Sequence, residues 1–133
     1  PGIRAYMDKT KAEVKRTGFV STLFGRKIHI PAIGAKSAAE RSFGERAAIN
    51  APIQGAAADI IRRAMIRMPG ALEAAGLKTR MLLQVHDELV FEGDVDFLPT
   101  LREGVVARME SAAQLRVPLL VDAGTGRNWD EAH

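Results

Sequence analysis

The chain has 133 residues, of which 47% are apolar, so we expect one hydrophobic core and no second independent one. Lysine and arginine number 19 against 16 aspartates and glutamates, and a net charge of +3 is too small to identify a nucleic-acid-binding protein. The absence of cysteine excludes disulfides and thiolate metal sites, so any metal must bind oxygen or imidazole ligands. No stretch reaches the roughly eighteen uninterrupted apolar residues that suggest a membrane span.

The start of the chain predicts a helix followed by a hairpin. Residues 1–4, Pro-Gly-Ile-Arg, contain neither an initiating methionine nor a signal-peptide pattern, which we interpret as a start inside a longer polypeptide. Charged residues with sparse apolar positions predict a mostly exposed helix over Ile3–Arg16 that ends at Gly18. Two short runs, Phe19–Phe24 and Ile28–Ile30, flank a glycine-containing turn and predict a β-hairpin.

Two helices separated by a proline are expected next. A loop at Ile33–Lys36 precedes Ser37, which is followed three residues later by Glu40, the spacing of a capping box at a helix start. The residue before a proline disfavours the helical region, whereas proline suits a first helical turn. We therefore expect a break at Asn50–Pro52, a second helix from Pro52, and an end or kink of that helix at Pro69-Gly70.

The second half of the chain predicts an antiparallel hairpin. Arg80–Val85 and Leu89–Glu92 are apolar runs joined at His86-Asp87, which leaves room only for a tight turn with Asp87 at its apex.

The remaining segments complete a predicted α+β fold. Asp96 is expected to cap a helix over 97–113, and Val117–Val121 to form an edge strand because it contains Pro118. The tail from Gly124 to Trp129 is expected to be a loop. The 80–92 hairpin and the last strand would then share one antiparallel sheet, backed by the helices over 52–68 and 97–113.

Polar residues at the predicted hairpin turn are candidates for chemistry, because Asp87, Glu88 and His86 interrupt two runs that otherwise belong in a core. One interpretation is that Asp87 only serves the turn, since aspartate tolerates turn geometry and bonds its own backbone. The other is that Asp87 binds a hard cation such as Mg²⁺, which prefers one or two carboxylates with water and phosphate oxygens.

A second candidate group lies on the helices, where Arg46, Asn50 and Gln54 are spaced four apart. A plain amphipathic interpretation places Gln54 on the packed face, in line with Ile61 and Met65, where its amide needs partners. A buried glutamine bonded to backbone is one explanation.

Four separated stretches resemble family A DNA polymerases of the bacterial DNA polymerase I type, in the family's order and spacing. They are Gln84–Phe91, which resembles the motif C hairpin, Glu45–Ile61, which resembles the preceding helix pair, Thr22–Arg26 with Pro31, and Val117–Leu119 with Asn128–His133. The resemblance covers nearly the whole chain. It implies that residues 1–51 derive from the fingers and residues 52–133 from the palm.

The resemblance implies a metal-dependent nucleotidyl-transfer site. In this family the motif C aspartate, here Asp87, joins an aspartate from an upstream motif to bridge two Mg²⁺ ions, which activate the primer 3′-hydroxyl and stabilise the leaving pyrophosphate. Glu88 is implied as an accessory catalytic residue, because successive strand residues point to opposite faces and need not reach one metal. His86 is implied to support the primer terminus, its alternative being a histidine satisfied within the turn.

The resemblance also implies contacts with primer-template DNA. Arg46, Asn50 and Gln54 would donate hydrogen bonds to minor-groove acceptors, which occur at every base pair and permit contact without sequence reading. Arg26 is a further candidate for template contact, with a solvated turn arginine as the alternative.

The family's other metal aspartate and its nucleotide-binding helix are absent from this sequence. We therefore expect the isolated chain to be inactive and to bind Mg²⁺ only weakly. The strand that pairs with the motif C hairpin is absent too, which leaves a vacant sheet edge and predicts self-association.

Taken together, these features predict part of a cytoplasmic DNA-directed DNA polymerase of replication and repair, whose partners are primer-template DNA and deoxynucleoside triphosphates, with no membrane. Two alternatives stay open: a non-catalytic nucleic-acid-binding module, and a small α+β interaction domain with a structural His-Asp-Glu turn.

Overall fold

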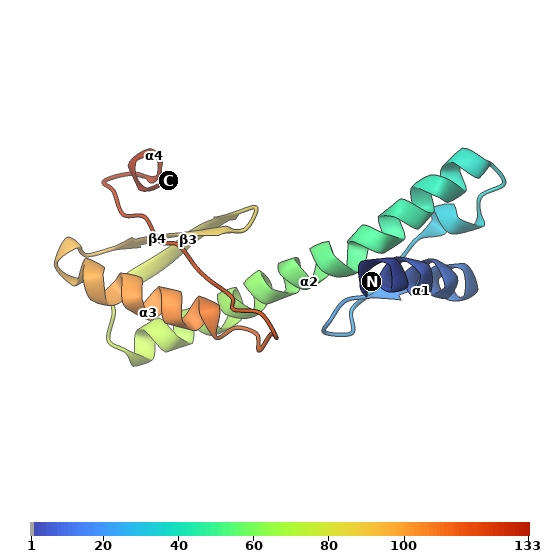
Figure 1. Cartoon of the computed structure of the whole chain (residues 1–133). Coiled ribbons are helices and arrows are strands. Elements are labelled where there is room, and N and C mark those ends of the chain that lie inside the picture. The colour runs from blue at the N-terminus through green and yellow to red at the C-terminus, as the bar shows by residue number, and fades with distance from the viewer. Residues whose placement is uncertain (1) are drawn as a thin grey trace. The chain divides into compact units, whose positions relative to one another are not determined.

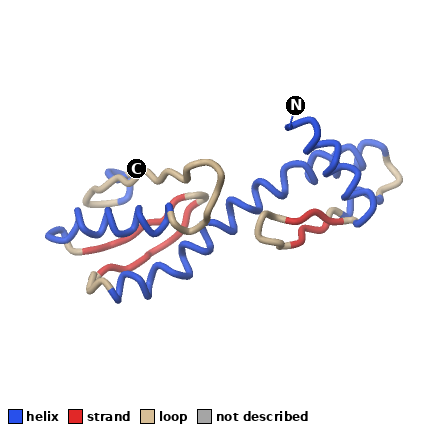
Figure 2. Tube along the Cα trace, turned by 60° about the horizontal axis from the view of Figure 1, so that its bottom comes forward, coloured by secondary structure: helices blue, strands red, loops and turns tan. Residues whose placement is uncertain are grey.

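The computed structural model describes residues 2–133 and divides the chain into two compact units, residues 1–59 and 60–133. Its helices and two small antiparallel sheets confirm the α+β class, and Figure 2 shows the two separate strand pairs. The expectation of a single core is wrong, because each unit has its own cluster of buried residues. No helix within residues 2–133 combines the length and apolar character needed to cross a membrane.

The first unit contains the predicted helix and hairpin. Its elements are α1 (Gly2–Thr17), β1 (Phe19–Ser21), β2 (Lys27–His29), the 3₁₀ turn η1 (Pro31–Gly34) and the first part of α2 (Ala38–Ala74). Gly18 ends α1 with a φ of 77°, and its N–H donates to the Val14 carbonyl over 2.8 Å. Strands β1 and β2 pair antiparallel, with Val20 opposite Ile28.

The long helix α2 overturns two expectations, since it is continuous over 37 residues. The break predicted at Asn50–Pro52 is wrong, and so is an end of the helix at Pro69-Gly70, where a kink was the alternative. A proline inside a helix costs about 3 kcal/mol. Near Pro69 this cost is offset by Met68 and Leu72, which are 0% and 3% exposed and whose burial contributes about 1.5–3 kcal/mol each.

Small residues let the rest of the first unit approach α2 closely. A Cβ atom on Gly55 would lie 2.6 Å from Thr22 Cγ2 and 2.9 Å from Ile28 Cδ1, so only glycine permits the observed approach of the β1–β2 hairpin. Gly44 plays the same part beneath η1, where a Cβ would lie 3.0 Å from the carbonyl carbon of Ala32.

The second unit contains the end of α2, β3 (Thr79–Val85), β4 (Glu88–Gly93), the 3₁₀ turn η2 (Val95–Phe97), α3 (Leu98–Glu110) and α4 (Trp129–Ala132). The predicted hairpin is confirmed, because β3 and β4 pair antiparallel. In Figure 1, α3 and the end of α2 lie along this strand pair. The helices contribute the buried core, and Phe91 of β4 packs against it.

Two expectations for the second unit are wrong in detail. Asp94 caps the turn η2, with its carboxylate accepting from the Asp96 N–H over 3.1 Å, so Asp96 is not the cap; Pro99 does lie in the first turn of α3. Val117–Val121 is not a strand, and the Val121 N–H instead donates to the Glu110 carboxylate on α3 over 3.1 Å.

The loop predicted from Gly124 to Trp129 is confirmed as far as Asn128, and the short helix α4 follows it. Asn128 caps this helix, since its side-chain oxygen accepts from the Glu131 N–H over 3.0 Å. The Glu131 carboxylate in turn accepts from the Arg127 N–H over 3.0 Å. This reciprocal arrangement closely resembles a capping box and explains why the segment is helical.

The packing at Gly55 predicts opposite effects for two glycine substitutions on α2. We expect Gly55→Ala to lower the free energy of unfolding by about 1–3 kcal/mol, because the added methyl group overlaps Thr22 and Ile28. Gly70→Ala should raise it by about 0.5–1 kcal/mol, since Gly70 is helical with open space around it. Urea unfolding of both variants measures the difference, and equal effects would contradict the close approach at Gly55.

Candidate functional site

The turn between β3 and β4 holds one of its two central residues in a left-handed conformation. Val85 and Glu88 are the last paired residues, so His86 and Asp87 alone make the turn. His86 has a φ of 52°, in the left-handed region that residues other than glycine adopt uncommonly, with asparagine, aspartate and histidine enriched among those that do. The Gln84 side chain donates to the His86 carbonyl over 2.9 Å and supports the turn. Asp87 therefore lies at the apex, as predicted, on a turn that carries local backbone strain.

The two predicted catalytic carboxylates differ in their surroundings. Asp87 is exposed at the apex, whereas Glu88 is half-buried at the start of β4. Glu88 Oε1 lies 3.0 Å from Nδ1 of His133, at the end of α4. This contact was missed from the sequence, since no spacing rule connects two positions so far apart in the chain. His133 therefore limits the positions open to Glu88 and leaves Asp87 as the accessible carboxylate.

The metal-binding role of Asp87 stays a prediction, and the groups around the turn can be compared with what Mg²⁺ requires. Within residues 2–133 no group of three or more histidine, aspartate or glutamate side chains is arranged to hold an ion. Asp87 offers hard oxygen ligands beside one further carboxylate, a donor set that Mg²⁺ accepts when water and phosphate oxygens complete its octahedron. The residues fit an incomplete magnesium site that needs ligands from elsewhere.

The predicted DNA-contacting residues of α2 lie together on its exposed face. Arg46, Asn50 and Gln54 are all exposed, and we call them the donor stripe. Arg46 Nη1 donates to Ser42 Oγ over 2.9 Å. The expectation that Gln54 lies on the packed face is wrong, because the neighbouring Gly55 is buried in its place. Continuity of the helix through residues 50–52 sets this rotation.

Large apolar residues flank the donor stripe. Phe43 and Ile53 are 62% and 63% exposed, and helical spacing places both on the same side of α2 as Asn50. The exposed face of α2 therefore presents two large apolar side chains beside the hydrogen-bond donors of the stripe.

Arg26 lies at the end of the β1–β2 turn and bonds to α2. Its Nε donates to Asp59 Oδ1 over 2.7 Å, and its Nη2 donates to the Gly55 carbonyl over 3.1 Å. The Thr22 hydroxyl donates to the other oxygen of Asp59 over 2.7 Å. Asp59 is only 9% exposed, so these bonds stabilise a carboxylate that would otherwise be costly to bury. The predicted template contact of Arg26 stays a prediction beside this structural role.

Electrostatics elsewhere in the first unit involve Glu45, which lies 2.7 Å from the Lys15 ammonium and 3.4 Å from that of Lys11. The hydrogen bond from Lys15 holds the pKa of Glu45 below its ordinary value, with Lys11 adding to the effect. This ion pair connects α1 to α2 beside the donor stripe.

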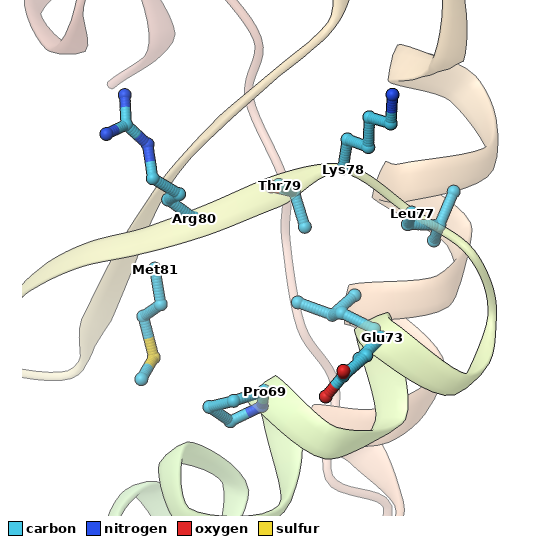
Figure 3. Close-up of a pocket in the computed structure, with 8 residues that line it drawn as sticks. Pro69, Glu73, Leu77, Lys78, Thr79, Arg80 and Met81 are labelled. Carbon is cyan, nitrogen blue, oxygen red and sulfur yellow. The ribbon is translucent and has the colours of Figure 1, made fainter.

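A pocket of about 510 Å³ lies between the end of α2 and the start of β3, and it is lined by Pro69, Leu72, Glu73 and residues 77–81. Figure 3 shows Met81 pointing toward Pro69, while Lys78 and Arg80 point away. The pocket lies at the start of β3, whereas the His86-Asp87 turn follows the end of that strand, and a strand extends by about 3.3 Å per residue. The pocket is therefore separate from the Asp87 site.

Backbone strain at His86 predicts a residue-specific effect on stability. His86→Val should lower the free energy of unfolding by about 1–2 kcal/mol, because a β-branched side chain disfavours a left-handed conformation. His86→Gly should raise it or leave it unchanged. His29→Val is the control, since His29 lies in strand β2, where β-branched residues are favoured. Thermal unfolding compares the three variants, and a tolerated valine at position 86 would contradict the strained turn.

Comparison with known proteins places this arrangement in a family. The model of DNA polymerase family A matches residues 1–131. The chain is 52% identical over 133 residues to DNA polymerase I of Pseudomonas aeruginosa and 47% identical over 131 residues to that of Bacillus subtilis. These alignments cover 100% and 98% of this chain and 15% of each relative.

A solved structure has the same fold as this chain. The POL domain of Pol1 from M. smegmatis, in complex with DNA primer-template and dNTP, superposes with a TM-score of 0.91 at 44% identity. The match covers 97% of this chain and 23% of that one. Since the family model spans almost all of the sequence, the chain belongs to DNA polymerase family A.

Proposed function

We propose that this chain forms part of a DNA-directed DNA polymerase and carries one of its metal-binding carboxylates, Asp87. The observation that carries the proposal is the exposed carboxylate at the apex of a two-residue turn with a left-handed His86. A turn that served only to reverse the chain would be more stable with glycine or asparagine at that position. The chain spans about 15% of the relatives it matches, so the activity is proposed for a longer polypeptide.

Asp87 would hold Mg²⁺ together with a carboxylate outside this chain, and Glu88 would act as an accessory catalytic residue. When bound, the two metal ions supply Lewis acidity at the primer 3′-hydroxyl and at the leaving pyrophosphate. The protein orients Asp87 through the hairpin, and the His133 contact restrains Glu88. His86, which is exposed beside Asp87, would contact the primer terminus.

Primer-template DNA would bind along the donor stripe. The side-chain N–H groups of the donor stripe are exposed and can reach a bound duplex. Hydrogen-bond acceptors occur in the minor groove at every base pair. Such contacts suit copying, because they are independent of sequence. Support comes from the matched M. smegmatis structure, which contains DNA primer-template and dNTP. We place this activity in DNA replication and repair in the bacterial cytoplasm.

The proposed metal-binding role predicts that a substitution of Asp87 changes the rate of nucleotide addition much more than the affinity for DNA. In the complete polymerase that carries this chain, Asp87→Ala should lower the rate of nucleotide addition by several orders of magnitude and change primer-template affinity little, since metal ions stabilise charge chiefly in the transition state. Arg62→Ala, at an exposed position of α2, is the control. Single-turnover extension and equilibrium DNA binding separate the two quantities. Equal loss of rate in both variants would sink the assignment and favour a non-catalytic nucleic-acid-binding module.

The isolated chain is also proposed to self-associate through the β3–β4 hairpin. The sheet has two strands, so each has an unpaired edge, and none of the apolar residues along it is buried. Leu82 and Leu83 are 52% and 42% exposed. Apolar area left in water forgoes about 25 cal/mol for each Å², and an open edge offers backbone hydrogen bonds to a second copy.

Light scattering over a range of concentrations tests this association. The apparent mass of the isolated chain should rise with concentration, and Leu83→Lys should lower that rise because it places a charge on the hairpin surface. Leu120→Lys is the matched control, since Leu120 is 80% exposed and lies outside the sheet. A strictly monomeric chain at every concentration would count against the proposal, and equal effects of both variants would move the contact away from the hairpin.

A further inference from the structure

The part of α2 that carries the donor stripe is intrinsically weak as a helix. Pro52 has no N–H to donate to the Ala48 carbonyl one turn earlier, and Gly55 adds backbone freedom that a helix must suppress. Both residues lie in the same stretch as Asn50 and Gln54. Because those two side chains are exposed, their directions depend on the helix backbone and not on packing around them.

Two side chains from other elements donate hydrogen bonds to backbone carbonyls on either side of this weak stretch. The Tyr6 hydroxyl of α1 donates to the Ile49 carbonyl over 2.8 Å. The Arg26 guanidinium donates to the Gly55 carbonyl over 3.1 Å. A carbonyl oxygen has two lone pairs, so each can accept the intrahelical N–H and the side-chain donor together.

The Arg26 bond is itself fixed by buried groups. Asp59 holds the guanidinium through Nε, and its second oxygen accepts from the Thr22 hydroxyl at the other end of the turn. Since a glycine is required at position 55 for the approach, the turn cannot slide along the helix without steric overlap. The contact between the β1–β2 turn and α2 therefore fixes where the turn lies along the helix, and it also contributes to stability.

We propose that Tyr6 and Arg26 are positioning residues for DNA binding, which brace the backbone of α2 at Ile49 and Gly55 and thereby hold Asn50 and Gln54 in register with the minor groove. The inference rests on the proposed function. In it, Arg26 affects DNA binding indirectly, through its hydrogen bond to the backbone of α2. Neither side chain needs to touch DNA. Losing one brace lets the helix between them fray and lowers the fraction of molecules in which both donors are aligned.

The first arm of the test measures the helix itself in the 133-residue chain. Tyr6→Phe removes only the hydroxyl, and it should speed hydrogen exchange of the Ile53 amide, which pairs with the Ile49 carbonyl, by about fivefold, the usual effect of one net hydrogen bond. Arg26→Lys, which keeps the charge but loses the fork geometry, should do the same at the Asp59 amide.

Thr17→Val is the matched control for Tyr6→Phe. The Thr17 hydroxyl also donates to a helix carbonyl, that of Glu13, over 2.9 Å. Both residues lie on α1, so this bond does not touch α2. This variant should leave the Ile53 and Asp59 amides unchanged apart from any global loss of stability. Unaltered exchange in Tyr6→Phe, or an equal increase in Thr17→Val, overturns the brace.

The second arm measures DNA affinity in the complete polymerase. Tyr6→Phe should weaken primer-template binding by about fivefold and leave the rate at saturating DNA unchanged. A double-mutant cycle then asks whether Tyr6 acts through Asn50: in an Asn50→Ala background the same change should cost little further affinity. Arg26→Lys and Gln54→Ala form the second cycle.

The outcomes separate the two proposals. If Asn50→Ala weakens binding and Tyr6→Phe does not, or if their effects are additive, the positioning role is overturned and the DNA contact stands. If Asn50→Ala and Gln54→Ala bind DNA as tightly as the unaltered enzyme, the DNA contact and the positioning role both fail.

Discussion

The first unit depends on the close approach of the β1–β2 turn to helix α2 at Gly55. A side chain at that position would overlap Thr22 and Ile28, so the absence of a Cβ permits the contact. The buried Asp59 then fixes the turn, because its two oxygens accept from Thr22 and Arg26. Removing either donor would leave a buried carboxylate partly unsatisfied, which costs more than the bond itself contributes. Because a lost donor costs more than the bond contributes, the Asp59 carboxylate favours this one arrangement of the turn as well as stabilising it.

The second unit has a different constraint, since its hairpin is supported on one side only. Phe91 packs with the helices α2 and α3, while Leu83 remains exposed on the partner strand. A two-stranded sheet is marginal in water unless a helix covers one face, and here helices do. Backbone strain at His86 can persist because this packing and the Val85–Glu88 pairing over-determine the turn. The exposed Asp87 is the result of that arrangement.

Elements set by local rules could be predicted from the sequence, and those set by distant packing could not. The helix ended by Gly18 and the tight hairpin around Asp87 follow from turn chemistry and spacing alone. The continuity of α2 through Pro52 and Pro69 does not, because each proline favours a boundary locally and only buried neighbours reverse that preference. Val117–Val121 has strand composition but pairs with no strand, and Glu110 takes its backbone N–H instead.

The same distinction applies to the candidate site. Asp87 and the donor stripe could be selected as candidates because motif spacing places them on one turn and one helix, whereas Asp59 and His133 act on partners far away in the sequence. For Gln54 the sequence left two interpretations open: its spacing from Arg46 places it with the predicted DNA contacts, and the pattern of a separate second helix places it on the packed face. The continuity of α2 and the exposure of Gln54 decide between them. Residues that contact a substrate can be conspicuous in a linear motif. Residues proposed to orient them are defined by the fold, because the hydrogen bonds that connect α1, the β1–β2 turn and α2 are visible only in the structure.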